Sequence, residues 1–124
     1  MRFVLPALLA LHGVIHLLGF VKAFELAEVA ELQLPVSPRA GLLWLAAAIL
    51  LVGSAAAVFL TPRLWWVPAL VGVTLSQALI IGAWGDARFG TIANGILLVP
   101  ILLAAVDLRP SSLRSLYRTE ARAA

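Results

Sequence analysis

The sequence contains no cysteine, and only 12% of its 124 residues are charged. The absence of cysteine excludes disulfide bonds, thiolate metal sites and thiol redox chemistry. Soluble domains carry about 25% charged residues, and a chain this short buries too small a share of its surface to hide the 63% of residues that are hydrophobic. The composition therefore excludes an ordinary soluble domain and predicts a protein whose solvent is a lipid bilayer.

Recognisable catalytic motifs are also absent, since no nucleophile, phosphate-binding loop or metal motif stands out. His12 and His16 lie one helical turn apart, as in half of a zinc site, but the intervening Gly-Val-Ile lacks the glutamate of H-E-x-x-H. Two histidines on one helix cannot occupy both axial positions of one haem iron, so a bis-histidine haem would need a dimer. We predict no metal, no haem and no catalytic residue. An enzyme with His16 as acid–base and Asp86 as its orienting partner is a less favoured alternative.

Long apolar runs dominate what is present. A membrane-crossing helix needs about 20 apolar residues, and we predict four such spans at about 3–23, 39–60, 64–84 and 91–108. The connections after the second and third spans are short, which favours antiparallel neighbours. The sequence predicts an all-α integral membrane four-helix bundle, running up-down-up-down, as one domain over residues 1–108.

An acidic segment, 24–38, separates the first two spans. Glu25, Glu28 and Glu31 recur at every third residue among apolar residues, a pattern typical of a short helix lying in the membrane interface. Serine at 37 and proline at 38 resemble an N-cap followed by proline at the first helical position. We therefore expect an interfacial helix and then a well-defined start of the second span.

Basic residues predict the orientation, because positive charge accumulates on the cytoplasmic side. The side that holds both termini carries Arg2, Arg63, Arg109, Arg114, Arg118 and Arg122. The opposite side carries only Lys22, Arg39 and Arg88. Both termini are therefore expected in the cytoplasm, with residues 109–124 as a basic amphipathic tail on the lipid surface, or else as a solvated tail. The basic charge is accounted for by lipid headgroups, and we expect membrane lipids rather than nucleic acid as partners.

Polar side chains within the predicted spans gather in the outer half of the bundle. Ionisable and polar groups at such depth are costly and are candidates for function. We predict a ligand site formed by His12, His16, Gln77, Trp84 and Asn94, with a rim of Lys22, Asp86 and Arg88. Gly19 would let another backbone approach beside His16. A purely structural role for the histidines, hydrogen-bonded to Gln77 and Asn94, is the alternative.

Three motifs carry a resemblance: HGVIHLLGFVKAF at 12–24, PVSPRAGLLWLAAA at 35–48 and WGDARFGTIANGIL at 84–97. Together they resemble a bacterial four-helix membrane family of unknown function, over residues 1 to about 108. The resemblance implies that the family keeps a common set of residues, and it implies no activity. This set comprises His12, His16, Lys22, Trp84, Asp86, Arg88, Phe89, Gly90, Thr91 and Asn94. The hydropathy is also similar to that of DoxX-like membrane proteins. The expected location is the bacterial cytoplasmic (inner) membrane, as a multi-pass protein.

Three functions remain open. The first is a protein that binds a lipid or small amphipathic ligand in the outer-half pocket. The second is a small dimeric transporter, for which His12 or His16 would have to carry the coupling proton, since the first span has no carboxylate. The third is a structural subunit of a larger membrane complex. A homo-oligomer is compatible with each of them.

Overall fold

The structure, a computed structural model, describes residues 2–107 and residue 123. This part of the chain is helical and contains no strand. Its helices are α1 (Val4–Ala23), α2 (Pro38–Leu60), α3 (Trp66–Gly82), the single turn α4 (Trp84–Ala87) and α5 (Gly90–Asp107). The all-α class is therefore confirmed. The tail predicted at 109–124 lies outside the described residues, apart from residue 123.

Three helices are long and apolar enough to cross a membrane: α1 with 20 residues, α2 with 23 and α5 with 18. The third apolar segment differs from the prediction. It was expected to run unbroken over 64–84, but α3 has 17 residues and ends at Gly82. Ala83, with φ −115° and ψ 35°, interrupts the helix, and Trp84 opens the separate turn α4. The glycines at 82 and 85 weaken helix formation on both sides of this break.

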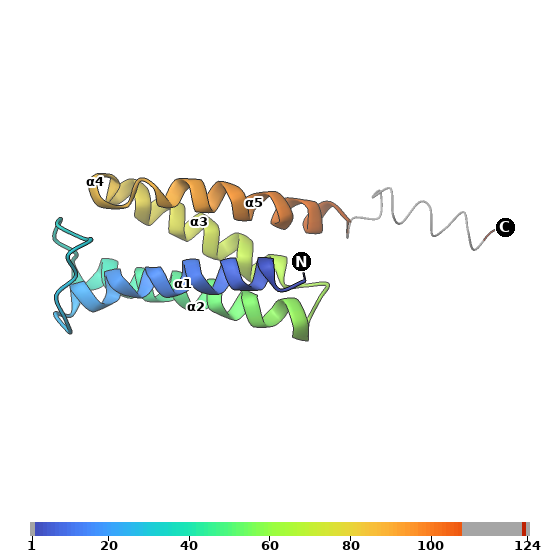
Figure 1. Cartoon of the computed structure of the whole chain (residues 1–124), viewed down its shortest axis with the longest axis horizontal. Helices are drawn as coiled ribbons and strands as arrows, with labels where there is room; N and C mark the ends of the chain where they lie inside the picture. The colour runs from blue at the N-terminus through green and yellow to red at the C-terminus, as the bar shows by residue number, and fades with distance from the viewer. Residues whose placement is uncertain (1, 108–122, 124) are drawn as a thin grey trace.

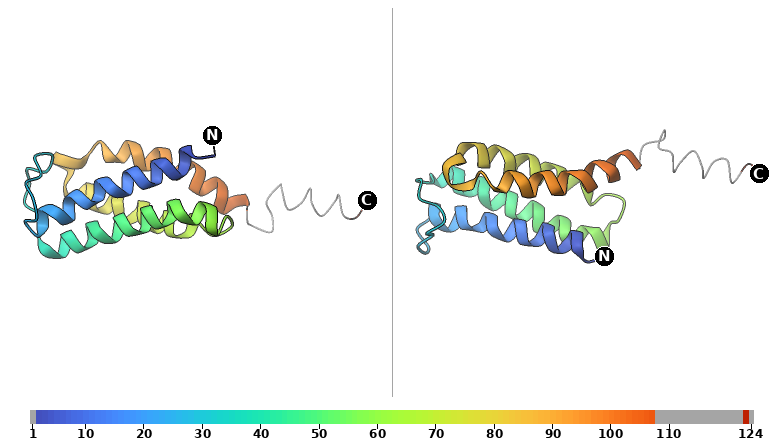
Figure 2. Two further views of the ribbon diagram at one scale, coloured as in Figure 1. Left: turned by 60° about the horizontal axis from the view of Figure 1, so that its bottom comes forward. Right: turned by 45° about the horizontal axis from the view of Figure 1, so that its top comes forward.

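The long helices run roughly along one direction, and each packs mainly against the next one in the sequence (Figures 1 and 2). Helix α1 packs extensively against α2, α2 against α3, and α3 against α5. The contact between α1 and α5 is slight. The seam between these two helices is therefore much looser than the three between consecutive long helices.

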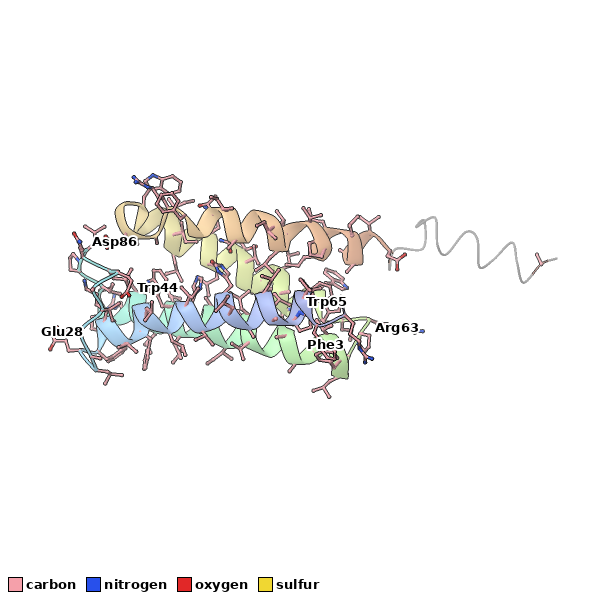
Figure 3. All side chains as sticks on the ribbon, in the orientation of Figure 1. Phe3, Glu28, Trp44, Arg63, Trp65 and Asp86 are labelled. Atoms are coloured by element: carbon pink, nitrogen blue, oxygen red, sulfur yellow. The ribbon has the colours of Figure 1, made fainter. Side chains whose placement is uncertain are left out.

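The two ends of the assembly differ in what they carry. Residues 24–37 and α4 lie at one end, and the turn between α2 and α3 lies at the other, together with Phe3 (Figures 1 and 3). Between the ends, many large apolar side chains are exposed on the outer surface, among them Leu11, Ile49, Ile81 and Leu103. Such a surface is typical of one that meets lipid. The interior near the second end is an apolar cluster that includes Leu9, Leu51, Ala69, Leu97 and Ile101.

The interfacial helix predicted within 24–38 is not formed. Helix α1 ends in a Schellman arrangement, in which the N–H of Glu25 binds the carbonyl of Lys22 and the N–H of Leu26 binds that of Val21. Glu25 adopts a left-handed conformation, with φ 52°, and this turns the chain away from the helix axis. The next helix starts only at Pro38. Its predicted cap is confirmed, since the hydroxyl of Ser37 accepts the N–H of Ala40 at 3.2 Å.

A close approach between α1 and α2 occurs at Gly19. A Cβ atom at this position would overlap the indole ring of Trp44. Trp44 is buried, and its ring stacks at a tilt on His16, with centroids 5.1 Å apart. The residue that fills the space left by Gly19 is therefore a tryptophan side chain, where the sequence had suggested a neighbouring backbone.

We predict that Gly19→Ala destabilises the protein by about 1–3 kcal/mol, because the added methyl group forces Trp44 out of its position. The matched control is Gly53→Ala on α2, where a Cβ meets nothing within 4 Å and the higher helix propensity of alanine applies. Thermal unfolding of both variants in detergent measures the difference. Equal stability of the two variants would contradict the packing described for Gly19.

Candidate functional site

Three helices meet through one buried hydrogen-bonded cluster. Nε2 of His12 on α1 lies 2.8 Å from Oδ1 of Asn94 on α5 and 3.3 Å from the hydroxyl of Ser76 on α3. The Ser76 hydroxyl also donates to the same Asn94 oxygen, at 3.1 Å. His12, Ser76 and Asn94 are all buried, with exposed fractions of 6%, 0% and 4%. Asn94 is therefore the common partner that joins α1, α3 and α5.

The cluster continues from Asn94 toward one side of the bundle. The amide nitrogen of Asn94 donates to Oε1 of Gln77 at 3.0 Å, and the amide nitrogen of Gln77 donates to the hydroxyl of Thr91 at 3.2 Å. Gln77 and Thr91 are only half-buried. The bonds thus lead from the buried histidine to polar atoms at the surface between α3 and α5.

Local sequence brings these groups together. Thr91 and Asn94 lie three residues apart near the start of α5, so they share one helix face. Gly90 allows this start to pack closely, because a Cβ there would lie 2.7 Å from Cδ1 of Ile80 and 4.0 Å from Cε1 of His12. A glycine at the first position of α5 therefore lets the Ile80 side chain pack directly against the start of this helix, with the His12 ring nearby.

The direction of the bonds assigns the tautomer of each histidine. The Asn94 oxygen can only accept, so Nε2 of His12 carries the hydrogen. Nδ1 of His16 lies 2.9 Å from the carbonyl oxygen of His12, which also only accepts, so Nδ1 of His16 carries the hydrogen. The two rings meet edge to face, with centroids 4.7 Å apart. The neighbouring histidines thus have opposite tautomers.

His16 has an unusual environment. It is 2% exposed, and its Nε2 atom is buried with no hydrogen-bond partner in the described part of the chain. A buried acceptor without a donor costs about 1–3 kcal/mol. His16 packs instead between His12 and the Trp44 ring, so it contributes packing more than hydrogen bonding.

Two grooves lie beside the cluster. The larger, about 550 Å³, runs between α3 and α5. Its lining residues are Val73, Thr74, Gln77, Ala78, Ile81, Thr91, Asn94, Gly95 and Leu98. The smaller, about 120 Å³, lies between α1 and α5, with His12 among otherwise apolar residues. His16 and Trp84 are not among the lining residues of either groove.

The remaining predicted residues lie away from the cluster. Trp84 is 50% exposed on α4, and the Arg88 guanidinium lies 5.0 Å above the Phe89 ring. Lys22 donates to the carbonyl of Leu32, and the Asp86 carboxylate accepts the N–H of Leu34 at 2.7 Å. Two of the three predicted rim residues therefore bind the segment between α1 and α2.

The sequence reasoning did not select Ser76, Thr91 or Trp44 as site residues. Thr91 lies three residues before Asn94 on the same helix face, so helical spacing could have added it. Ser76 is next to Gln77 in the chain, and because adjacent residues do not share a helix face, spacing gives no signal for it. The contact of Trp44 with His16 depends on the rotation of α2 about its own axis. Spacing along one helix carries no such information.

No group of three or more histidine or acidic side chains able to hold a metal ion occurs in the described ranges. The arrangement can offer amide and hydroxyl hydrogen bonds beside apolar walls, which suits binding of a small amphipathic molecule. Comparisons of the chain with protein-family models, curated proteins and solved structures found no match. The role of the cluster is therefore inferred from its geometry.

We predict that His12→Leu destabilises the protein, whereas His16→Leu is tolerated. Leucine at 12 leaves the buried oxygen of Asn94 without one of its two donors, which costs about 1–3 kcal/mol. Leucine at 16 removes an unpartnered nitrogen and leaves no other side chain without its partner. Thermal unfolding of the two variants in the same detergent provides the comparison. A larger loss for His16→Leu than for His12→Leu would contradict the assigned bonding.

Proposed function

We propose that this chain is a small integral membrane protein that binds a lipid or another small amphipathic molecule in the groove between α3 and α5. The observation that carries this proposal is the distribution of polar atoms in the groove. Gln77, Thr91 and Asn94 lie toward the end where α3 finishes and α5 begins, and Val73 and Leu98 continue the groove toward mid-helix. A volume of about 550 Å³ falls within the usual range of small-molecule sites.

In this proposal Gln77, Thr91 and Asn94 contact the polar part of the ligand, and Val73, Ala78 and Leu98 contact its apolar part. His12 acts through Asn94, whose side chain it holds in place. His16 supports His12 from the other side, by its contact with the ring and with the backbone carbonyl. Trp84, which does not line the groove, does not contact the ligand in this proposal.

We further propose that α1, α2, α3 and α5 cross a bacterial inner membrane as an antiparallel bundle with both termini in the cytoplasm. The positive charges near the described helix ends support this orientation only in combination with the arginines at 109–122. Helix α3 is the shortest of these four helices, with 17 residues, which is the lower limit for a membrane span. Because the chain has no cysteine, single cysteines placed at Arg63 and Arg88 can be labelled in intact cells with a reagent that does not cross the membrane. Labelling at 88 but not at 63 is expected, and the reverse pattern would contradict the orientation.

Ligand binding is tested by native mass spectrometry of the detergent-purified protein. We expect a bound amphipathic molecule in the wild type, and its loss by about three- to tenfold in Thr91→Val, which removes one hydroxyl from the groove. The control is Thr61→Val at the other end of the bundle, where the hydroxyl binds only the carbonyl of Ala57 in its own helix. A dimer without any retained ligand would contradict the proposal and favour the transporter.

A further inference from the structure

The end of the bundle nearest the polar cluster is covered by a short segment, Leu32–Leu34, which we call the strap. Lys22 at the end of α1 donates to the carbonyl of Leu32, and Asp86 in α4 accepts the N–H of Leu34 at 2.7 Å. Leu32 is itself buried, with 7% of its surface exposed. Figure 1 shows the segment between α1 and α2 extending across this end toward α4. The strap is therefore fastened to both halves of the bundle, on the face that would meet water.

The groove between α3 and α5 opens in a different direction. It is bounded by side chains of two neighbouring helices. On α5 it extends over the eight residues from Thr91 to Leu98, or about 10 Å at the helical rise. Ile81, which lines the groove, is exposed, and so are Ile92 and Val99, which adjoin the lining residues Thr91 and Leu98 along α5. In a bilayer these side chains would face hydrocarbon, so the opening of the groove faces the lipid rather than the water.

None of the residues that line this groove is ionisable. A charged headgroup placed there would be withdrawn from water without a counter-charge, which is costly in a membrane. The bonds described above use one of the two amide hydrogens of Asn94 and one of those of Gln77. Asn94 Oδ1 already accepts two hydrogen bonds. One amide hydrogen of Asn94, one of Gln77 and the hydroxyl hydrogen of Thr91 remain as donors, so the groove can bind an uncharged group that accepts hydrogen bonds, such as an ester or ketone carbonyl.

From these observations we propose that the ligand is an uncharged lipid with carbonyl groups, and that it enters sideways from the hydrocarbon layer between α3 and α5 while the strap stays closed. This inference rests on the proposed function and narrows it. The ligand class follows from the uncharged lining of the groove, and the route from its position between exposed apolar side chains. A water-soluble solute is not the expected ligand, because the groove is bordered by exposed apolar side chains.

The headgroup is tested with two lipids that have the same acyl chains, dioleoylglycerol and dioleoylphosphatidylglycerol. Each is added in increasing amounts to the full chain in detergent, and the bound fraction is read by native mass spectrometry. We expect the uncharged lipid to bind at least about tenfold more tightly, which corresponds to about 1.4 kcal/mol. Equal or tighter binding of the charged lipid would overturn the inference.

The route is tested in two experiments, one that fixes the strap in place and one that fills the groove. A Cβ at Gly85 would lie 3.5 Å from Cδ1 of Leu34, so in the double variant Leu34→Cys with Gly85→Cys the two side chains can be joined by a short bismaleimide, since the chain has no other cysteine. The strap is then fixed to α4. Sideways entry predicts unchanged uptake of dioleoylglycerol after this reaction, and loss of uptake by the crosslinked protein would overturn it.

The groove itself is filled by Thr74→Trp, because Thr74 is an exposed lining residue on α3. Val71→Trp adds the same ring at an exposed position of α3 that does not line the groove. We expect at least about tenfold weaker binding of dioleoylglycerol in the first variant and wild-type binding in the second. Equal binding in both would place the lipid elsewhere and overturn the inference.

The two levels of the proposal fail in distinguishable ways. If the wild type retains neither added lipid, the inference on ligand class is wrong. The proposed function is also wrong only if the protein as purified carries no amphipathic molecule of any kind. If a charged or water-soluble molecule is found in the purified protein, the proposed function stands and the inference falls.

Discussion

A single amide oxygen, Oδ1 of Asn94, connects three of the four long helices. It accepts from His12 on α1 and from Ser76 on α3, while Asn94 itself belongs to α5. In a hydrocarbon environment such polar groups cannot form hydrogen bonds with water, so each must have a hydrogen-bond partner within the protein. The slight contact between α1 and α5 makes this bond the main specific link across their seam. The relative placement of the helices, and with it the shape of the groove, depends on this interaction.

The other parts of the bundle surround this polar cluster. At one end, an apolar core that includes Leu9, Leu51 and Ile101 packs the helices together. At the other end, the strap is held by Lys22 and Asp86, which keep their charges near the surface. Between them, the close approach at Gly19 brings Trp44 against His16. The polar cluster is thus enclosed on three sides and reaches the surface mainly through Gln77 and Thr91.

Much of this arrangement follows from the sequence, and the exceptions have physical causes. The first, second and last apolar helices lie within about one residue of their predicted bounds, because hydropathy over some 20 residues is a strong signal. The break at Ala83 was missed, since hydropathy averages over the glycines that surround it. The predicted helix in 24–38 was wrong because the spacing of Glu25, Glu28 and Glu31 carries no sign that Glu25 adopts a left-handed conformation.

For the site, the sequence predicted that His12, Gln77 and Asn94 would lie together, and they do. The rotation of each helix, which decides that Trp44 and not Trp84 adjoins the histidines, is set by packing between helices and could not be predicted from single-helix periodicity.

The most direct test of this account is the protonation of the His12 ring, read by nitrogen-15 NMR of the protein labelled at its two histidines. A donor at Nε2 of His12 is required if Asn94 Oδ1 is the acceptor that joins the helices, and a donor at Nδ1 of His16 is required by the carbonyl of His12. The account predicts a hydrogen on Nε2 of His12 and on Nδ1 of His16, with the His12 signal altered in Asn94→Leu. A His12 ring whose Nε2 carries no hydrogen would contradict it, because the bond on which the arrangement of α1, α3 and α5 depends would then run in the wrong direction.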